Sequence, residues 1–146
     1  MKLARLPLLL VLCLGWPLQV LAVKVEPGIS LELAQWRAAN ISALEYQLLL
    51  RIPEQPDEPI SGELRIRLQL ADASQGLQLD FKAPAQSVHS VSANGSAVAH
   101  RIEREHILLP PEAVRAGGNE IAISFTAGDS SLNRNPGYLH TLFVPD

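Results

Sequence analysis

Apolar and polar residues alternate strictly along the chain from Ile60 to Leu70. A period of two places successive side chains on opposite faces of a β-strand, whereas a helix would scatter them around its circumference. The apolar face comprises Gly62, Leu64, Ile66, Leu68 and Leu70. The opposite face comprises Glu63, Arg65, Arg67 and Gln69. This segment is therefore predicted to be a strand with one face in the core and the other in water.

The same alternation returns in short segments along most of the chain. The segments expected to form strands are 41–52, 60–70, 77–81, 88–93, 97–102, 107–109, 121–125 and 138–144. Asn94-Gly95 separates two of them and favours a tight hairpin turn, because both residues tolerate a positive φ angle. A second hairpin turn is expected at Glu103–Glu105. We therefore expect an all-β fold, either an antiparallel β-sandwich or a saddle-shaped sheet of about eight strands.

One short helix is expected before the strands, from Ser30 to Asn40. Ser30 is suited to be its N-cap, Leu33 and Trp36 recur at helical spacing, and Asn40 can close it. A single further helical turn is expected at 110–116, where Gly117-Gly118 ends it.

The first 22 residues have the pattern of a secretory signal peptide. Lys2 and Arg5 precede the uncharged, almost wholly apolar run 6–21, and the small residue Ala22 stands at the cleavage position. The apolar run is short for a membrane-spanning helix, which needs about 20 continuous apolar residues. We predict cleavage after Ala22 and export to the periplasm or the extracellular space, with an uncleaved anchor as the alternative. Residues 23–146 then form one domain.

Composition narrows the range of functions further. The whole chain of 146 residues has a net charge of −3, and loss of the signal leaves 124 residues with 10 basic against 15 acidic side chains, a net charge of −5. Nucleic-acid binding requires a clustered basic surface, so no such partner is expected. The single cysteine, Cys13, lies in the signal segment, which excludes a disulfide framework and a thiolate zinc site in the mature chain. No membrane association is expected after cleavage.

Catalytic motifs are absent from the sequence. A metalloprotease helix carries HExxH, but no two of the four histidines are four residues apart; they are His89, His100, His106 and His140. His100, Glu103 and His106 would form a metal site only if they converged across the second hairpin. We interpret them instead as solvated strand or turn residues, and no metal site is expected.

The remaining side chains that could take part in catalysis are explained by solvation or by ion pairing. The chain contains no G-x-S-x-G elbow, and the acidic pairs Asp57/Glu58 and Glu103/Glu105 lie in polar loop sequence, where carboxylates serve solvation. The adjacent cations of the 60–70 strand are expected to pair with acids on neighbouring strands. No catalytic residue is therefore predicted.

Several segments, in order, resemble one protein family. They are Ala34–Arg37, Tyr46–Pro53, Ile60–Gly62, Leu79–Phe81, Gly118–Ile121, Gly128–Asn135 and Tyr138–Asp146. Together they are similar to the N-terminal region of the aminopeptidase N family of zinc metallopeptidases, over roughly residues 31–146. The resemblance implies the N-terminal β-saddle domain, which packs against a thermolysin-like catalytic domain and helps wall its substrate cleft.

In that family the zinc, the HExxH motif and the exopeptidase motif belong to the catalytic domain, and this sequence contains neither motif. The resemblance therefore implies no cofactor in this chain and no activity of the chain alone. It implies the non-catalytic domain of an exported zinc aminopeptidase, present as a truncated or split product, with the catalytic domain supplied in cis or in trans.

The resemblance also suggests which residues lie nearest to the cleft. These are His140, Thr141, Leu142 and Phe143. Many family members follow the threonine of this strand with a glutamine that contacts the substrate N-terminus. Leu142 stands at that position and cannot accept a hydrogen bond from an ammonium group, so this contact is in doubt. The alternative is an edge or core strand without a ligand role.

Two other functions remain open from the sequence. One is a stand-alone secreted β-sandwich that serves as a binding or adaptor module without enzyme activity. A missing catalytic partner would leave an apolar face uncovered around Leu139, Leu142, Phe143 and Val144, whereas an adaptor would be polar there. The other is a periplasmic sugar- or protein-binding sandwich, although Trp36 is the one tryptophan after the signal and makes an aromatic sugar platform hard to build.

Overall fold

The strand content predicted from the alternation is present in the structure. The computed structural model describes residues 23–55, 57–127, 133–135 and 138–140, the last two ranges for the backbone alone. The helix is α1 (Leu31–Asn40), and two single 3-10 turns are η1 (Ala85–Ser87) and η2 (Pro111–Ala113). The described strands are β1 (Ile41–Arg51), β2 (Ser61–Leu70), β3 (Leu77–Asp80), β4 (Val88–Ala93), β5 (Ser96–Ala97), β6 (Arg101–Glu103), β7 (His106–Leu109), β8 (Gly117–Thr126), β9 (Asn133–Asn135) and β10 (Tyr138–His140).

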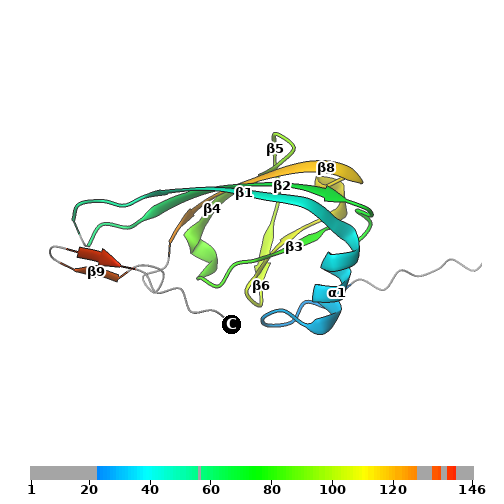
Figure 1. The fold of residues 1–146 in the computed structure, drawn as a ribbon, viewed down its shortest axis with the longest axis horizontal. Coiled ribbons are helices and arrows are strands. Elements are labelled where there is room, and N and C mark those ends of the chain that lie inside the picture. The colour runs from blue at the N-terminus through cyan, green and yellow to red at the C-terminus, as the bar shows by residue number, and fades with distance from the viewer. Residues whose placement is uncertain (1–22, 56, 128–132, 136–137, 141–146) are drawn as a thin grey trace, which may run out of the picture.

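All described strand pairs are antiparallel, which confirms the predicted all-β class. The larger sheet has the order β1-β2-β8-β4-β5, the smaller has the order β3-β7-β6, and β9 and β10 form a separate hairpin. Figure 1 shows the larger sheet as a long curved layer, with the smaller sheet beneath the end nearest α1. The hairpin lies at the opposite end of β1 and β2.

The hydrophobic core lies between the two sheets. Ile66, Leu68 and Leu70 are buried on the face that the sequence assigns to the core. They pack with buried residues of the neighbouring strands, including Ile121 of β8 and Ile107 of β7. β8 is flanked by β2 and β4 in the larger sheet, and Ile121 on its inner face is 0% exposed.

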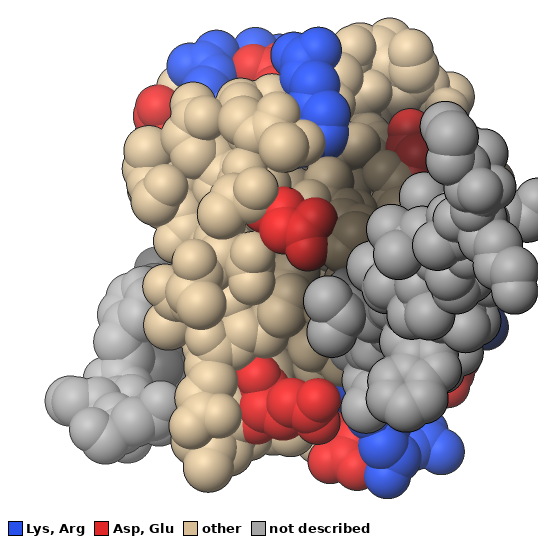
Figure 2. Space-filling model, turned by 90° about the vertical axis from the view of Figure 1, so that its right-hand side faces the viewer, with Lys and Arg blue, Asp and Glu red and all other residues tan. Residues whose placement is uncertain are grey.

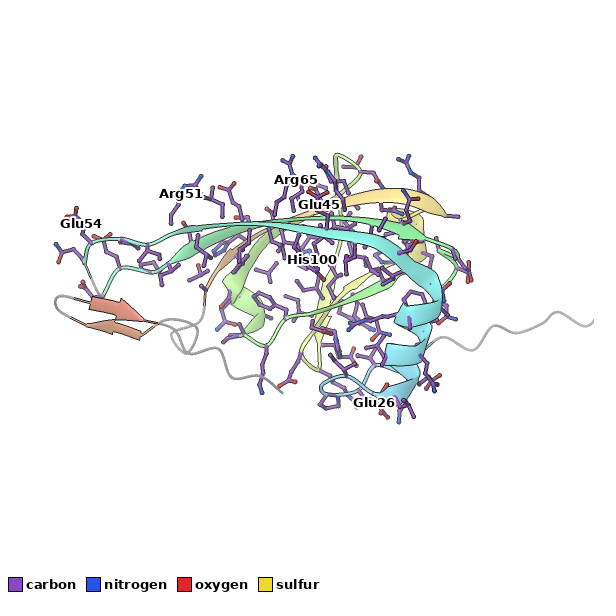
Figure 3. All side chains as sticks on the ribbon, viewed as in Figure 1. Glu26, Glu45, Arg51, Glu54, Arg65 and His100 are labelled. Carbon is purple, nitrogen blue, oxygen red and sulfur yellow. The ribbon has the colours of Figure 1, made fainter. Side chains whose placement is uncertain are left out.

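The outer face of the larger sheet is charged, as the sequence predicts. Arg67 Nε lies 2.9 Å from Glu120 Oε2 on β8, and Arg65 Nε lies 3.8 Å from the other carboxylate oxygen. Arg67 also lies 4.0 Å from Glu45 on β1. In Figure 3, Arg65, Glu45 and Arg51 project from this face. Exposed pairs of this kind contribute about 0.2–1 kcal/mol each, so their main effect is to keep this face solvated.

Both predicted hairpin turns have the required backbone geometry. Asn94 and Gly95 have φ angles of 52° and 84°, and Arg104 and Glu105 have φ angles of 48° and 68°. Two successive positive φ angles are typical of a type I′ turn, which matches the twist of the strands that it joins.

The prediction of a single strand over residues 97–102 is wrong. β5 and β6 occupy its two ends but belong to different sheets. The chain leaves the larger sheet after Ala97 and enters the smaller one at Arg101, and Val98 keeps one bond through its N–H to the carbonyl of Val91 at 3.0 Å. Alternation of side chains cannot reveal this exchange, because the period of two is the same in both sheets.

α1 has the caps that its sequence predicts. Ser30 Oγ accepts from the N–H of Leu33 at 3.1 Å, and Asn40 Nδ2 donates to the carbonyl of Trp36 at 3.1 Å. β1 follows at once, and its pairing with β2 shifts register between Ser42 and Glu45. Of the predicted last strand, 138–140 form β10, and 141–144 lie outside the described residues.

Gly76, in the turn before β3, is predicted to tolerate no side chain. Its φ is +73°, and a Cβ there would overlap the carbonyl oxygen of Leu109. We expect Gly76→Ala to lower the free energy of unfolding by about 3 kcal/mol, measured by urea denaturation. Gly95→Ala is the matched control, because Gly95 has a φ of +84° and open space around it, so only the backbone cost of about 1 kcal/mol is expected. Equal losses in the two variants would contradict this account.

Candidate functional site

The inner face of β1 is apolar and exposed. Leu44, Tyr46 and Leu48 are 49%, 59% and 58% exposed. Tyr46 pairs with Ile66, and Leu48 pairs with Leu64, so these side chains continue the face of β2 that is buried in the core. β1 ends the strand order of the larger sheet, outside the part covered by the smaller sheet. We call these three residues of β1 the apolar strip.

A groove of about 410 Å³ runs beside the apolar strip. Leu44 and Tyr46 form one wall, Leu79 and Phe81 form the other, and Ile66 contributes to the floor. Phe81 is fixed by an edge-to-face contact with Phe125 of β8, with ring centroids 5.9 Å apart. The groove is thus an apolar recess between the edge of the larger sheet and β3. It can bind an apolar surface.

Arg37 and Asp80 form the polar rim of the groove. Arg37 makes a bidentate pair with the Asp80 carboxylate, at 2.6 and 2.9 Å, and its guanidinium also donates to the carbonyl of Gln78 at 2.8 Å. This pair joins α1 to β3 and closes one end of the recess. Charge-assisted bidentate geometry gives the contact a fixed orientation as well as attraction.

His106 extends this cluster into the interior. It is 1% exposed, and its Nδ1 lies 3.0 Å from Asp80 Oδ1. On its other side, Nε2 lies 2.9 Å from the carbonyl oxygens of both Glu26 and Gly28. An acceptor therefore lies near each ring nitrogen. The approach of Nδ1 to Asp80 does not have the geometry of a hydrogen bond.

The Asp80 carboxyl has a pKa below its ordinary value. Partial burial raises this pKa, but the hydrogen bond and charge of Arg37 and the charge of His106 lower it by more in sum. The carboxylate is therefore held in its ionised form beside Arg37. Because it contacts both Arg37 and His106, it is the centre of the polar rim.

The interpretation of His106 as a solvated residue is wrong, because the segment around Glu26 and Gly28 covers it. His100 is half-buried, with Nδ1 3.4 Å from the carbonyl of Val98, and Glu103 pairs with Arg101. These groups do not converge, and the described residues contain no cluster of His, Cys, Asp or Glu suited to hold a metal ion. No step involving zinc can be derived from the described side chains.

Of the residues that the resemblance places nearest to the substrate cleft, the structure describes one, and only its backbone. The backbone of His140 is in β10, paired with Asn133, while Thr141, Leu142 and Phe143 lie outside the described residues. The apolar face expected around Leu139 and Val144 therefore stays a prediction. The exposed apolar face that the structure does describe is the strip on β1.

A second depression, of about 540 Å³, lies on the outer face of the larger sheet. Its floor is formed by small side chains such as Ser92, Ala122 and Ser124, with Arg65 and Glu63 beside them. Figure 2 shows basic residues with acidic residues among them along the top of the molecule, and a second group of acidic and basic residues at the bottom. This depression is larger than the groove, but it is shallow and polar, so the groove is the better candidate for an apolar partner.

Comparison with known proteins does not assign the chain to a family: no family model matches it, and no curated protein matches its sequence. Within the described part of the chain, no helix has the length and apolar character needed to cross a bilayer.

Asp80→Asn is expected to destabilise the domain at neutral pH. The substitution removes the charge that pairs with Arg37 and His106, at a cost of about 1–2 kcal/mol, a modest figure because the Asp80 side chain is 46% exposed. Because the folded-state pKa is lowered, this stability is present above the unfolded pKa of about 4 and is lost as pH falls through the folded value.

Urea denaturation at pH 7, 5 and 2.5 measures this dependence. The gap between wild type and Asp80→Asn is expected to be widest at pH 7 and to narrow as the pH falls from 5 to 2.5. The exposed Asp57 provides the control, since Asp57→Asn is expected to change little at any pH. A gap that stays constant across this pH range would contradict the role given to the Asp80 charge.

Proposed function

We propose that this chain is the non-catalytic N-terminal domain of an exported zinc aminopeptidase, and that it packs against a thermolysin-like catalytic domain. The observation that carries the proposal is the apolar strip on β1, three large side chains about half exposed beside an apolar groove. A soluble domain that kept this face in water would leave the favourable free energy of its burial unused. The ordered resemblance to the aminopeptidase N family supplies the identity of the partner.

The strip is large enough to matter for binding. Burying a whole Leu or aromatic side chain contributes about 1.5–3 kcal/mol, so the remaining half of each contributes about 1 kcal/mol. Three such side chains give about 3 kcal/mol, or a factor of about 100 in affinity. The Arg37–Asp80 pair at the end of the groove would then lie at the polar rim that surrounds the apolar centre of an interface.

In this proposal the chain contributes shape and not chemistry. The catalytic domain supplies zinc, the general base and the group that holds the free amine of the peptide. The chain walls the cleft, with His140, Thr141, Leu142 and Phe143 nearest to it by resemblance. Leu142 stands where many members of that family have an amide, so the chain would not supply that hydrogen bond to the free amine. Export through the signal at residues 1–22 would place the assembly in the periplasm or outside the cell.

A second candidate function is a stand-alone secreted binding module. The groove favours it, since a volume of about 410 Å³ falls within the range of about 300–1,000 Å³ that is typical of small-ligand sites. Its apolar walls and its single charged pair would suit a small apolar ligand with one polar end. In that case the apolar strip would belong to the ligand site and would need no catalytic partner.

The chain by itself is expected to be inactive. Purified and supplied with zinc, it should not hydrolyse aminoacyl-arylamide substrates, because it carries neither HExxH nor the exopeptidase motif. Release of the arylamine, followed by absorbance, checks this expectation. Turnover that disappears on addition of a chelator would overturn it.

The apolar strip can be tested against the opposite face of the same strand. The partner is the HExxH-containing domain encoded in frame after the codon for residue 146 or by the adjacent gene. Tyr46→Ser together with Leu48→Ser should weaken binding about 30-fold in titration calorimetry, since each loses about 1 kcal/mol.

The matched control is Gln47→Ser together with Leu49→Ser, because these residues alternate with the strip and line the depression on the outer face. This control should change affinity less than threefold. Equal losses in both variants would argue against the strip. Absence of any encoded HExxH domain would overturn the aminopeptidase proposal and favour the binding module.

A further inference from the structure

The segment between residues 23 and 30 is held to the domain by side chains from distant strands and turns. Each contact is to a backbone group of the segment, so the contacts do not depend on its side chains. The groups that make them are Gln75, Gln78, Arg104 and His106, which bond Val23, Val25, Glu26 and Gly28 over separations of 52 to 80 residues. In Figure 3, Glu26 lies at the base of α1, far from the charged outer face of the larger sheet.

Val23 lies between two glutamines. Its N–H donates to Gln75 Oε1 at 2.8 Å, and its carbonyl accepts from Gln78 Nε2 at 3.0 Å. The other atom of the same amide, Gln78 Oε1, is buried and has no hydrogen-bond partner among the described residues. A buried acceptor without a donor carries a desolvation penalty that nothing offsets. The amide cannot be turned over to relieve it, because its oxygen would then face the Val23 carbonyl.

A small cavity lies beside Val23 and the two glutamines. It has a volume of about 10 Å³ and is lined by Val23, Trp36, Gln75, Gly76 and Gln78. This is room for about one additional small polar group. The site therefore combines an acceptor that Val23 already occupies, an unpartnered acceptor on a second glutamine that contacts Val23, and a small space that both glutamines line.

A peptide nitrogen cannot satisfy both acceptors, because it carries one proton. An α-ammonium carries three protons and a positive charge, and its hydrogen bonds to amide oxygens are charge-assisted. We propose that Gln75 and Gln78 form a binding site for the α-ammonium group of Val23, created when the signal segment is removed. The inference rests on cleavage after Ala22 and is independent of the aminopeptidase proposal.

The bond that breaks is the peptide bond between Ala22 and Val23. A signal peptidase of the export machinery adds water across it, so the hydroxyl passes to the Ala22 carboxyl and a hydrogen passes to the Val23 nitrogen. The new amine then takes one proton from solvent. Cleavage thus converts the Val23 peptide nitrogen, a neutral donor with one proton, into an α-ammonium group with three protons. The additional protons can bond the unpartnered oxygen of Gln78.

The other charged groups around this end are paired with one another. Lys24 pairs with Glu26 at 2.7 Å, Arg37 of α1 pairs with Asp80, and Arg101 of β6 pairs with Glu103. His100 and Arg101 line the same open depression as Val23. Among the described residues the Val23 nitrogen bonds to Gln75 Oε1 and to no carboxylate, and the proposal adds Gln78 Oε1 as its second acceptor.

The first test uses the full chain, exported with its own signal and purified as the processed protein. Mass spectrometry is expected to find Val23 at the N-terminus. An amine-reactive reagent at pH 7 should then modify the Val23 α-amine about tenfold more slowly than in the Gln78→Met variant, which lacks the acceptor. The Lys24 ε-amine is the internal reference and should react equally in both proteins.

Gln75→Glu separates the acceptor role from simple packing. It keeps the oxygen that accepts from the Val23 nitrogen and adds a negative charge, so the Val23 amine should stay protected as in wild type or better. Loss of protection in both variants would indicate a packing role and would overturn the proposal, as would a mature N-terminus at another residue.

The second test moves the new amine away from its site. Gly-Ser inserted between Ala22 and Val23, with cleavage after Ala22 retained, should lower Tm by about 3 °C at pH 6. An α-amine bound by acceptors has a raised pKa, so its stabilisation is present below about pH 8 and is lost as pH rises through the folded value. The difference should therefore shrink at pH 9.5. An insertion without effect at pH 6 would mean that water satisfies Gln78, and the proposal would fail.

Discussion

The packing of β2 and β8 against the smaller sheet determines which side chains this domain buries. β3 and β7 have four residues each, whereas β1, β2 and β8 have ten or eleven. A short sheet can cover only part of a longer one, and in this domain it covers the middle strands. The inner face of β2 is therefore core, and the continuation of the same face onto β1 is surface. The groove lies where this coverage ends, so the candidate site follows from the difference in size between the two layers.

Local patterns predict the elements well and their surroundings poorly. The alternation in 60–70 and the Asn94-Gly95 turn depend on side-chain period and φ angle, which are properties of neighbouring residues. The alternation in β1 is equally apolar, yet its strip is exposed, because the position of a strand within a sheet depends on distant partners. The division of 97–102 between two sheets is missed for the same reason. Sequence period shows that a strand has an apolar face, but not whether another layer covers it.

The polar part of the candidate site could not be predicted from local sequence. Arg37, Asp80 and His106 come from α1, β3 and β7, and 43 residues separate the first two. His106 directly follows a charged turn, so its sequence context resembles that of a solvated residue. His106 is buried because the N-terminal segment around Glu26 and Gly28 packs over it. Residues 140–143, which come from family resemblance and not from physical pattern, stay a prediction.

The position of β1 at the end of the sheet order has a consequence for the newly made protein. Eleven residues of strand there present backbone N–H and C=O groups along one side, with apolar residues on both faces. Such a strand can recruit strands from other chains, and charged residues are the usual protection against this. Within β1 that protection is limited to Glu45, near the middle of the strand, and Arg51, its last residue. A newly made chain in which β1 stays uncovered is therefore exposed to aggregation through this edge.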